Sequence, residues 1–288
     1  MWQISFFFYF IFGAMSYVLR RVLAQKLGNH NRLINSVFFI CFLLPAAIIL
    51  SFFFPHDLNV GAFNLLLLFG GSIIWPILGI ISFRANKEVD VGIFTIISNL
   101  SPIFTIAIAL TFLHENLGKL QFVGIGLLIL SGLLIASSQL NKKNRASTKN
   151  ILICLLSAAV LGVAVAYERF MLSRIDFGAY LIYGWGSQII WSAILTGKEL
   201  KKLPDLFNKA AKKRKTLIVW GITSTLKSVA FILALKISGS ASIISAASNF
   251  MSIVVVITAY FYLKERQHMI HKWLAAGIGI AGLLLISH

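Results

Sequence analysis

The sequence predicts an all-α integral membrane protein with ten transmembrane helices, arranged as two inverted five-helix repeats. Three observations predict this class: a strongly apolar composition, ten long apolar runs, and a repeat at a fixed offset. Of the 288 residues, 58% are hydrophobic and 12% are charged, whereas soluble domains average about 25% charged residues. This composition excludes a soluble globular domain, because too little polar material is present to cover its core.

Ten continuous apolar runs approach the length of about 20 residues that a helix needs to cross a bilayer. Transmembrane strands would alternate apolar and polar residues, and these runs do not alternate. Helices are also favoured because they satisfy their own backbone hydrogen bonds in lipid. The ten predicted spans are Ile4–Leu19, Leu33–Phe54, Ala62–Phe83, Val91–Leu113, Leu120–Ser137, Ile151–Leu172, Ala179–Thr196, Thr216–Leu235, Ala241–Leu263 and Met269–Ser287.

The net charge of +17, from 26 Lys and Arg residues, raises the possibility of nucleic-acid binding. With ten spans, however, 21 of these cations fall in connections on one side of the membrane and four on the other, and Lys227 lies within a span. The positive-inside rule assigns the richer side to the cytoplasm, so both termini are predicted outside it. The positive charge therefore indicates how the chain is oriented in the membrane, and it would also attract anionic membrane lipids. No nucleic-acid partner is expected.

A shift of 150 positions aligns residues 98–137 with residues 248–287 without a gap. In so apolar a background, polar and glycine matches are more informative than matches of Leu or Ile. The informative matches are Ser98 with Ser248, Asn99 with Asn249, Glu115 with Glu265 and Gly132 with Gly282. We interpret them as a diverged internal duplication.

The predicted organisation is a five-helix repeat at 1–140, a basic linker at 141–150, and a second five-helix repeat at 151–288. Because five is odd, the second repeat must enter the membrane in the opposite orientation. Inverted repeats are a design of secondary transporters, whose substrate site lies near the midplane between the repeats.

The chain resembles the EamA repeat of the drug/metabolite transporter superfamily. The resemblance rests on Ser101-Pro102, a Glu after the fourth helix of each half, and glycine-rich final helices (Glu115 and Glu265; Gly124, Gly126, Gly132, Gly277, Gly279 and Gly282). It implies a ten-helix transporter of small organic solutes around a central cavity. Ser252 departs from the pattern, since it stands where the first half has Pro102.

Two ionisable residues lie within predicted spans, Lys227 in the eighth and Glu168 in the sixth. A charge at the centre of a membrane helix costs at least about 2.5 to 3.5 kcal/mol. Lys227 is therefore a candidate to bind a carboxylate or phosphate of the substrate, and Glu168 a candidate to receive an amine or a proton. Two alternatives stay open: the two residues pair with each other, or Lys227 extends along the helix to the membrane surface.

Ser98, Asn99, Ser248 and Asn249 are further candidates for substrate binding. Their polar groups would face the substrate from two symmetric sides, or would hydrogen-bond neighbouring helices instead. Pro102 is predicted to loosen a helix interior one turn later, because it lacks a backbone donor.

Trp75, Gln188 and Tyr167 complete the predicted site, because aromatic walls suit apolar or cationic solutes. The alternative is a membrane-interface belt or packing against lipid. Glu115 and Glu265 are predicted to be structural caps or ion-pair partners, and Gly277 and Gly279 to permit close helix contacts.

No enzyme motif is present: the sequence contains no phosphate-binding loop, HExxH or nucleophile elbow. We expect no catalytic residue, metal or cofactor. The predicted function is secondary transport of a small polar organic metabolite by alternating access, with an amino acid or similar zwitterion favoured. Coupling to a proton or ion is left open. The alternatives are an exporter of aromatic or cationic compounds and a lipid flippase or scramblase; the expected location is a bacterial inner membrane.

Overall fold

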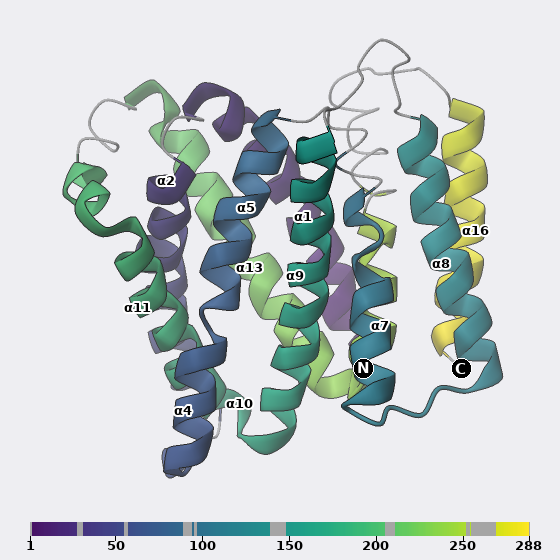
Figure 1. Cartoon of the computed structure of the whole chain (residues 1–288), viewed down its shortest axis with the longest axis horizontal. Coiled ribbons are helices and arrows are strands. Elements are labelled where there is room, and N and C mark those ends of the chain that lie inside the picture. Colours follow the sequence, from purple (N-terminus) through teal and green to yellow (C-terminus); the bar gives the residue numbers. More distant parts are fainter. Residues whose placement is uncertain are drawn as a thin grey trace. The chain divides into compact units, whose positions relative to one another are not determined.

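The computed structural model of the chain describes residues 2–27, 31–54, 57–88, 94, 97–138, 148–204, 211–251, 254 and 269–287. Every regular element among them is a helix (Figure 1). Each predicted span contains helix, in whole or in part. Five described helical stretches are long and apolar enough to cross a membrane: Trp2–Arg20, Arg32–Ser51, Ala62–Ala85, Thr148–Arg174 and Arg214–Ser238. The all-helical membrane class is thereby supported, and the ten-helix inverted repeat stays a prediction.

The chain packs into two compact units, and each unit takes segments from both halves of the sequence. The α1–α13 unit consists of Trp2–Arg84 and Tyr167–Ile237, and the α7–α8 unit contains Ala85–Ala166 and Ser238–His288. These units differ from the predicted sequence repeats, whose boundaries stay a prediction. Most of the predicted linker lies outside the described residues.

The α1–α13 unit contains helices from the first, second, third, sixth, seventh and eighth predicted spans. Its helices are α1 (Trp2–Leu27), α2 (Asn31–Val37), α3 (Leu44–Ser51), α4 (Ala62–Gly71), most of α5 (Ile74–Glu88), the end of α9 (Thr148–Arg174), α10 (Phe177–Ala179), α11 (Trp185–Thr196) and most of α13 (Ala211–Ser238). A π-helical segment, Phe38–Leu43, joins α2 to α3, and a second, Tyr180–Gly184, joins α10 to α11. Such wide turns inside helices often occur at functional sites.

Helices α1 and α13 pack antiparallel along a regular seam. Its contacts form three layers, seven residues apart on each helix: the rings of Tyr9 and Phe231 at 5.4 Å, the hydroxyls of Ser16 and Ser224 at 2.6 Å, and Leu23 in one apolar cluster with Leu217. Seven residues are about two helical turns, so each layer returns to the same helix face. The sequence analysis did not identify this pairing.

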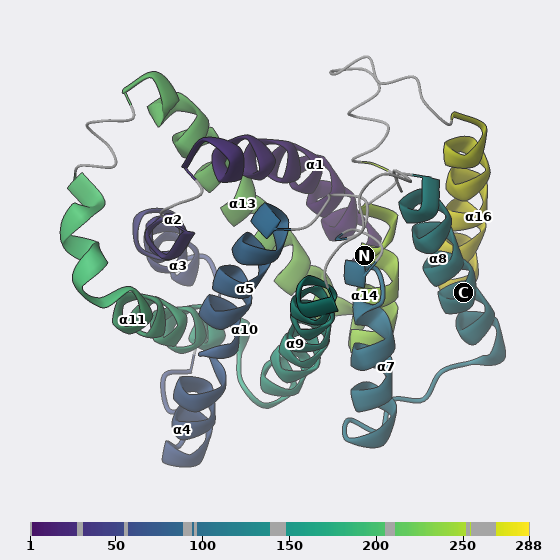
Figure 2. The ribbon, with the colours of Figure 1, turned by 45° about the horizontal axis from the view of Figure 1, so that its top comes forward.

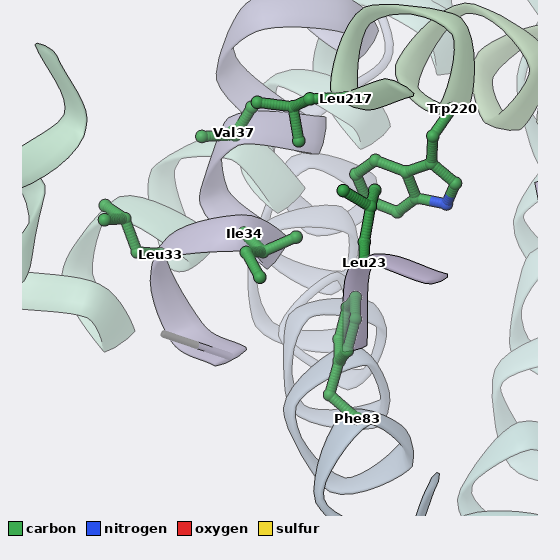
Figure 3. Packing of buried hydrophobic residues seen from close by; sticks show 7 residues of the cluster. All are labelled: Leu23, Leu33, Ile34, Val37, Phe83, Leu217 and Trp220. Atoms are coloured by element: carbon green, nitrogen blue, oxygen red, sulfur yellow. The ribbon is translucent and has the colours of Figure 1, made fainter. Parts of the chain in front are cut away.

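The apolar cluster at one end of the seam joins four helices of this unit (Figure 3). Its buried members are Leu23 of α1, Leu33, Ile34 and Val37 of α2, Phe83 of α5, and Leu217 and Trp220 of α13. Lipid tails are as apolar as these side chains, so close packing rather than exclusion of water stabilises such contacts in a bilayer.

The α7–α8 unit contains helices from the fourth, fifth, sixth, ninth and tenth predicted spans. Its helices are α7 (Ser101–Thr111), α8 (Lys119–Ser138), the first part of α9, α14 (Ala241–Ser248) and α16 (Met269–Ser287). Helix α8 lies beside α16, and α7 beside α14 (Figures 1 and 2). Helices α8 and α16 begin 150 residues apart, which is the offset of the sequence repeat.

The backbones of α8 and α16 meet at two glycines. A Cβ atom added to Gly124 would lie 2.8 Å from the carbonyl oxygen of Gly282, and one added to Gly282 would lie 2.9 Å from that of Gly124. Only glycine permits this approach. The expectation for Gly277 is wrong, because a Cβ there would meet nothing within 4 Å.

Glu115 caps the start of α14, which agrees with the structural role predicted from the sequence. Its carboxylate accepts hydrogen bonds from the Ala241 amide at 2.6 Å, the Ser242 amide at 3.2 Å and the Ser240 hydroxyl at 2.8 Å. These amides begin a helix and have no intrahelical acceptor, so a negative charge there is favourable. The counterpart, Glu265, lies outside the described residues.

Replacing Glu115 with alanine is expected to lower the free energy of unfolding by about 0.5–2 kcal/mol, the usual cost of a lost helix cap. The measurement is thermal unfolding of the purified protein in detergent. Asn116→Ala is the matched control, because Asn116 is an exposed neighbour on the same connection. Equal melting temperatures for the two variants would contradict a capping role.

Candidate functional site

Glu168 is a buried carboxylate near the end of α9, with 2% of its surface exposed. Tyr180, in the second π-helical segment, donates its hydroxyl to Oε1 at 2.7 Å. The second carboxylate oxygen, Oε2, is also buried and has no hydrogen-bond partner among the described residues. Leaving a charged acceptor unpaired in an apolar environment is costly.

Trp75 and Gln188 complete this group, which we call the Glu168 cluster (Glu168, Tyr180, Trp75 and Gln188). The indole of Trp75 lies near the Glu168 carboxylate, and the Gln188 side chain lies near the Tyr180 hydroxyl. Neither contact reaches hydrogen-bond geometry, so Trp75 Nε1 and Gln188 Nε2 remain buried donors without acceptors in the described structure. The cluster thus holds one unused acceptor atom and two unused donor atoms.

Tyr167 precedes Glu168 and connects α9 to α4. Its hydroxyl donates to the carbonyl oxygen of Leu67 at 3.0 Å, with that of Leu68 at 3.3 Å. Its ring fills the space beside Gly71, where an added Cβ would lie 2.2 Å from the ring. Tyr167 therefore positions the α9 segment that carries Glu168.

Lys227 lies on α13, half-buried, with Nζ 5.4 Å from the centre of the Tyr17 ring. The positive charge of Arg20 acts on Lys227. Glu168 interacts with a different set of groups, Tyr180 and Trp75. The structure therefore does not contain the Glu168–Lys227 pair that the sequence left open.

The two predicted asparagines lie in the α7–α8 unit and are both buried, with 5% and 4% exposed. Asn99 donates its side-chain amide to the carbonyl oxygen of Gly132 at 2.9 Å. Asn249 donates to the backbone carbonyl oxygen of Asn99, also at 2.9 Å. Of the two sequence alternatives, these contacts correspond to hydrogen bonding between neighbouring segments.

The α-helical hydrogen-bond pattern is interrupted at each asparagine. Leu100 N–H donates to Ile97 and Asn249 N–H to Ala246, both at 3.1 Å, so the turns tighten to a three-residue spacing. Helix α7 restarts at Ser101, with Pro102 in its first turn. The prediction that Pro102 loosens a helix interior is wrong, because proline is tolerated in a first turn, where its amide is not needed.

The predicted serines accompany these interruptions. Ser248 donates its hydroxyl to the carbonyl oxygen of Ser245 at 2.6 Å, and Ser98 is half-buried beside Asn99. The same region contains a contact that the sequence analysis missed, between the hydroxyls of Ser245 and Thr105 at 2.9 Å. It joins α14 to α7.

Residues 3–137 match the EamA-like transporter family. This segment belongs to that family. The family is part of the drug/metabolite transporter superfamily, which confirms the resemblance drawn from the sequence and indicates a membrane transporter. No curated protein sequence matches the chain significantly.

Solved structures are similar to this chain over almost its whole length. Among 28 matching chains, one crystal structure aligns with a TM-score of 0.62 over 97% of this chain and 98% of its own. The sequence identity is 11%, so this likeness supports the fold and carries no information on substrate.

The predicted site residues are divided between the two units. The α1–α13 unit contains Glu168, Lys227, Trp75, Gln188 and Tyr167, and the α7–α8 unit contains Ser98, Asn99, Ser248 and Asn249. The sequence analysis missed Tyr180, since nothing distinguishes a tyrosine in an apolar run. It also assigned Arg20 to a loop, because the predicted span ended at Leu19, whereas α1 continues to Leu27.

The described residues contain no group of three or more His, Cys, Asp or Glu side chains that could hold a metal ion. The acidic and basic side chains of the predicted site are Glu168 and Lys227, and the proposed function is argued from these two residues.

Proposed function

We propose that the protein is a secondary transporter that moves a small polar organic metabolite by alternating access, with an amino acid or similar zwitterion as the favoured substrate. The observation that carries this proposal is the buried Oε2 atom of Glu168, which has no partner in the described structure. An ammonium group would supply both the charge and the donor that this oxygen lacks. The unused N–H groups of Trp75 and Gln188 would donate hydrogen bonds to oxygen atoms of the same substrate.

Lys227 supports a substrate with a second, negative end. It belongs to the same compact unit as Glu168, and no carboxylate acts on it in the described structure. A zwitterion supplies a partner for each of these charges, which are costly to leave alone in apolar surroundings.

The asparagines support the alternating-access part of the proposal. Asn99 bonds Gly132, but Asn249 bonds Asn99 rather than Gly282, the repeat counterpart of Gly132. Equivalent residues thus make different bonds, as we expect when two related halves adopt different conformations and exchange them during transport.

Lys227→Ala is expected to weaken substrate uptake into proteoliposomes, with a rise in KM of about 10- to 150-fold, the range expected from loss of one charge-assisted hydrogen bond. Lys215→Ala is the matched control, because Lys215 is an exposed lysine on the same helix. Unchanged uptake by Lys227→Ala, with a known substrate, would remove Lys227 from the site.

A second function, export of aromatic or cationic compounds, is favoured by the position of Trp75 beside Glu168. A cation could bind the carboxylate and the indole face together. In this case Trp75→Ala should reduce transport more than Lys227→Ala does. The reverse order would favour the zwitterion.

We propose a bacterial inner membrane as the location, with both termini outside the cytoplasm. The support is the distribution of Lys and Arg over the predicted connections. Alkaline phosphatase fused to the C-terminus is expected to be active, and the same enzyme inserted in the 141–150 linker inactive. The opposite pattern would reverse the predicted orientation.

A further inference from the structure

The seam between α1 and α13 carries two positive side chains on its contact faces. Arg20 follows Ser16 by four residues on α1, and Lys227 follows Ser224 by three residues on α13. Residues at these spacings share a helix face. Because the two serines are hydrogen-bonded to each other at 2.6 Å, both cations lie along the seam.

The directions of the two side chains bring them toward one level of the seam. A helical side chain is tilted toward the N-terminus of its own helix. On α1 this tilt takes Arg20 toward Ser16, and on the antiparallel α13 it takes Lys227 toward Ser224. This tilt brings the two side chains toward each other along the seam, and Arg20 acts on Lys227 as a like charge.

Aromatic rings support both cations without neutralising them. The guanidinium carbon of Arg20 lies 4.4 Å from the centre of the Phe83 ring, and Lys227 Nζ lies 5.4 Å from that of Tyr17. Cation–π contacts of this kind hold a charge in place. They leave the N–H donors available, and Arg20 Nε is buried without a hydrogen-bond partner in the described structure.

Neither Glu168 nor Glu115 supplies a negative charge to these two cations. Glu168 interacts with Tyr180 and Trp75, and Glu115 caps α14. Tyr17 acts electrostatically on Arg20, and Arg20 acts on Lys227. Two cations on one helix seam, with Arg20 Nε buried and unpaired in the described structure, would be stabilised by an anionic partner.

We propose that Arg20 and Lys227 form a binding site for a phosphate-type oxyanion. The planar fork of Arg20 suits two oxygen atoms of one oxyanion, while Lys227 contributes a point charge. Two positive charges match a group with two negative charges. The inference shares Lys227 with the proposed function and adds Arg20 as the second anchor for the acidic group. A soluble phosphate compound and a phospholipid headgroup both carry this chemistry.

The test uses the full-length protein in maltoside micelles, with thermal unfolding followed as sodium phosphate is added at constant ionic strength, balanced with chloride. A bound ligand raises the apparent stability in a saturable manner, and we expect this for phosphate. Arg20→Gln and Lys227→Met should each weaken phosphate binding by about 10- to 150-fold. Arg214→Gln, an exposed arginine on α13, should bind phosphate as the unaltered protein does.

A second variant and a lipid arm complete the test. Arg20→Lys keeps the charge but loses the fork, so we expect binding between that of the unaltered protein and that of Arg20→Gln. In the lipid arm, phosphatidylglycerol is added to the protein in phosphatidylcholine nanodiscs. If phosphatidylglycerol stabilises the protein and competes with phosphate, the natural ligand is a lipid headgroup. Phosphate binding without an effect of phosphatidylglycerol would identify a soluble ligand.

The inference is overturned if neither phosphate nor phosphatidylglycerol stabilises the protein beyond chloride, or if Arg20→Gln binds phosphate unchanged. This failure is distinct from failure of the proposed function. Loss of uptake in Lys227→Ala together with no phosphate effect would refute the two-cation site and leave the transport proposal standing.

Discussion

Glu168→Gln is expected to reduce substrate affinity by about 10- to 150-fold while making the protein more resistant to unfolding. The loss of affinity follows because glutamine cannot offer an ammonium group a full negative charge. The gain in stability follows because the substitution removes a buried ionisable group whose Oε2 atom has no partner in the described structure. Uptake and thermal unfolding of the same preparation measure the two effects.

Two further variants separate the site from general effects of charge and packing. Tyr180→Phe removes the hydroxyl that donates to Oε1 and should reduce affinity less than Glu168→Gln, because the carboxylate remains. Glu199→Gln, on the segment Gly197–Lys202, should change neither measurement. A Glu168→Gln protein with normal uptake and lowered stability would show that Glu168 has a structural role.

Gly282→Leu is expected to destabilise the α7–α8 unit by at least about 1–3 kcal/mol, the usual cost of overpacking. The expected cost lies at the upper end or beyond, because the first added atom would lie 2.9 Å from a backbone oxygen of α8, which cannot rotate away. Gly124→Leu should behave in the same way from the other helix. Thermal unfolding in detergent measures both.

The same helices provide matched controls for this prediction. A Cβ atom at Gly126 on α8 or at Gly277 on α16 would meet nothing within 4 Å. Leucine at either position should therefore leave the melting temperature close to that of the unaltered protein, since it replaces glycine with a better helix former. Equal losses at Gly277 and Gly282 would contradict the backbone contact.

The helices and the charged candidates could be predicted from the sequence because their signals are local. A long run of apolar residues predicts a membrane helix whatever the helix packs against. A Glu or Lys inside such a run is noticeable because a charged side chain is energetically costly within the membrane. The same logic identified Glu115 as a cap, since it follows one apolar helix and precedes another. The family of residues 3–137 was recognised from motifs of this kind.

The remaining features depend on contacts between distant residues, which a single sequence does not record. Helix α1 continues past Arg20 to Leu27. The sequence did not predict this extension, because the apolar run that defined the span ends before Arg20. Asn99 bonds Gly132 and accepts from Asn249, and neither spacing is visible without the fold. Tyr180 reaches Glu168 through a π-helical segment, a backbone change that composition does not reveal.

The three-layer seam of α1 and α13 also limits how these helices can move. A slide of one residue, about 1.5 Å, would break the Ser16–Ser224 hydrogen bond and misalign the layers on either side. The next position that restores a seven-residue pattern lies about 10.5 Å away, well beyond a thermal fluctuation. We therefore expect α1 and α13 to move together as one rigid body. In such a movement the distance between Arg20 and Lys227 stays the same.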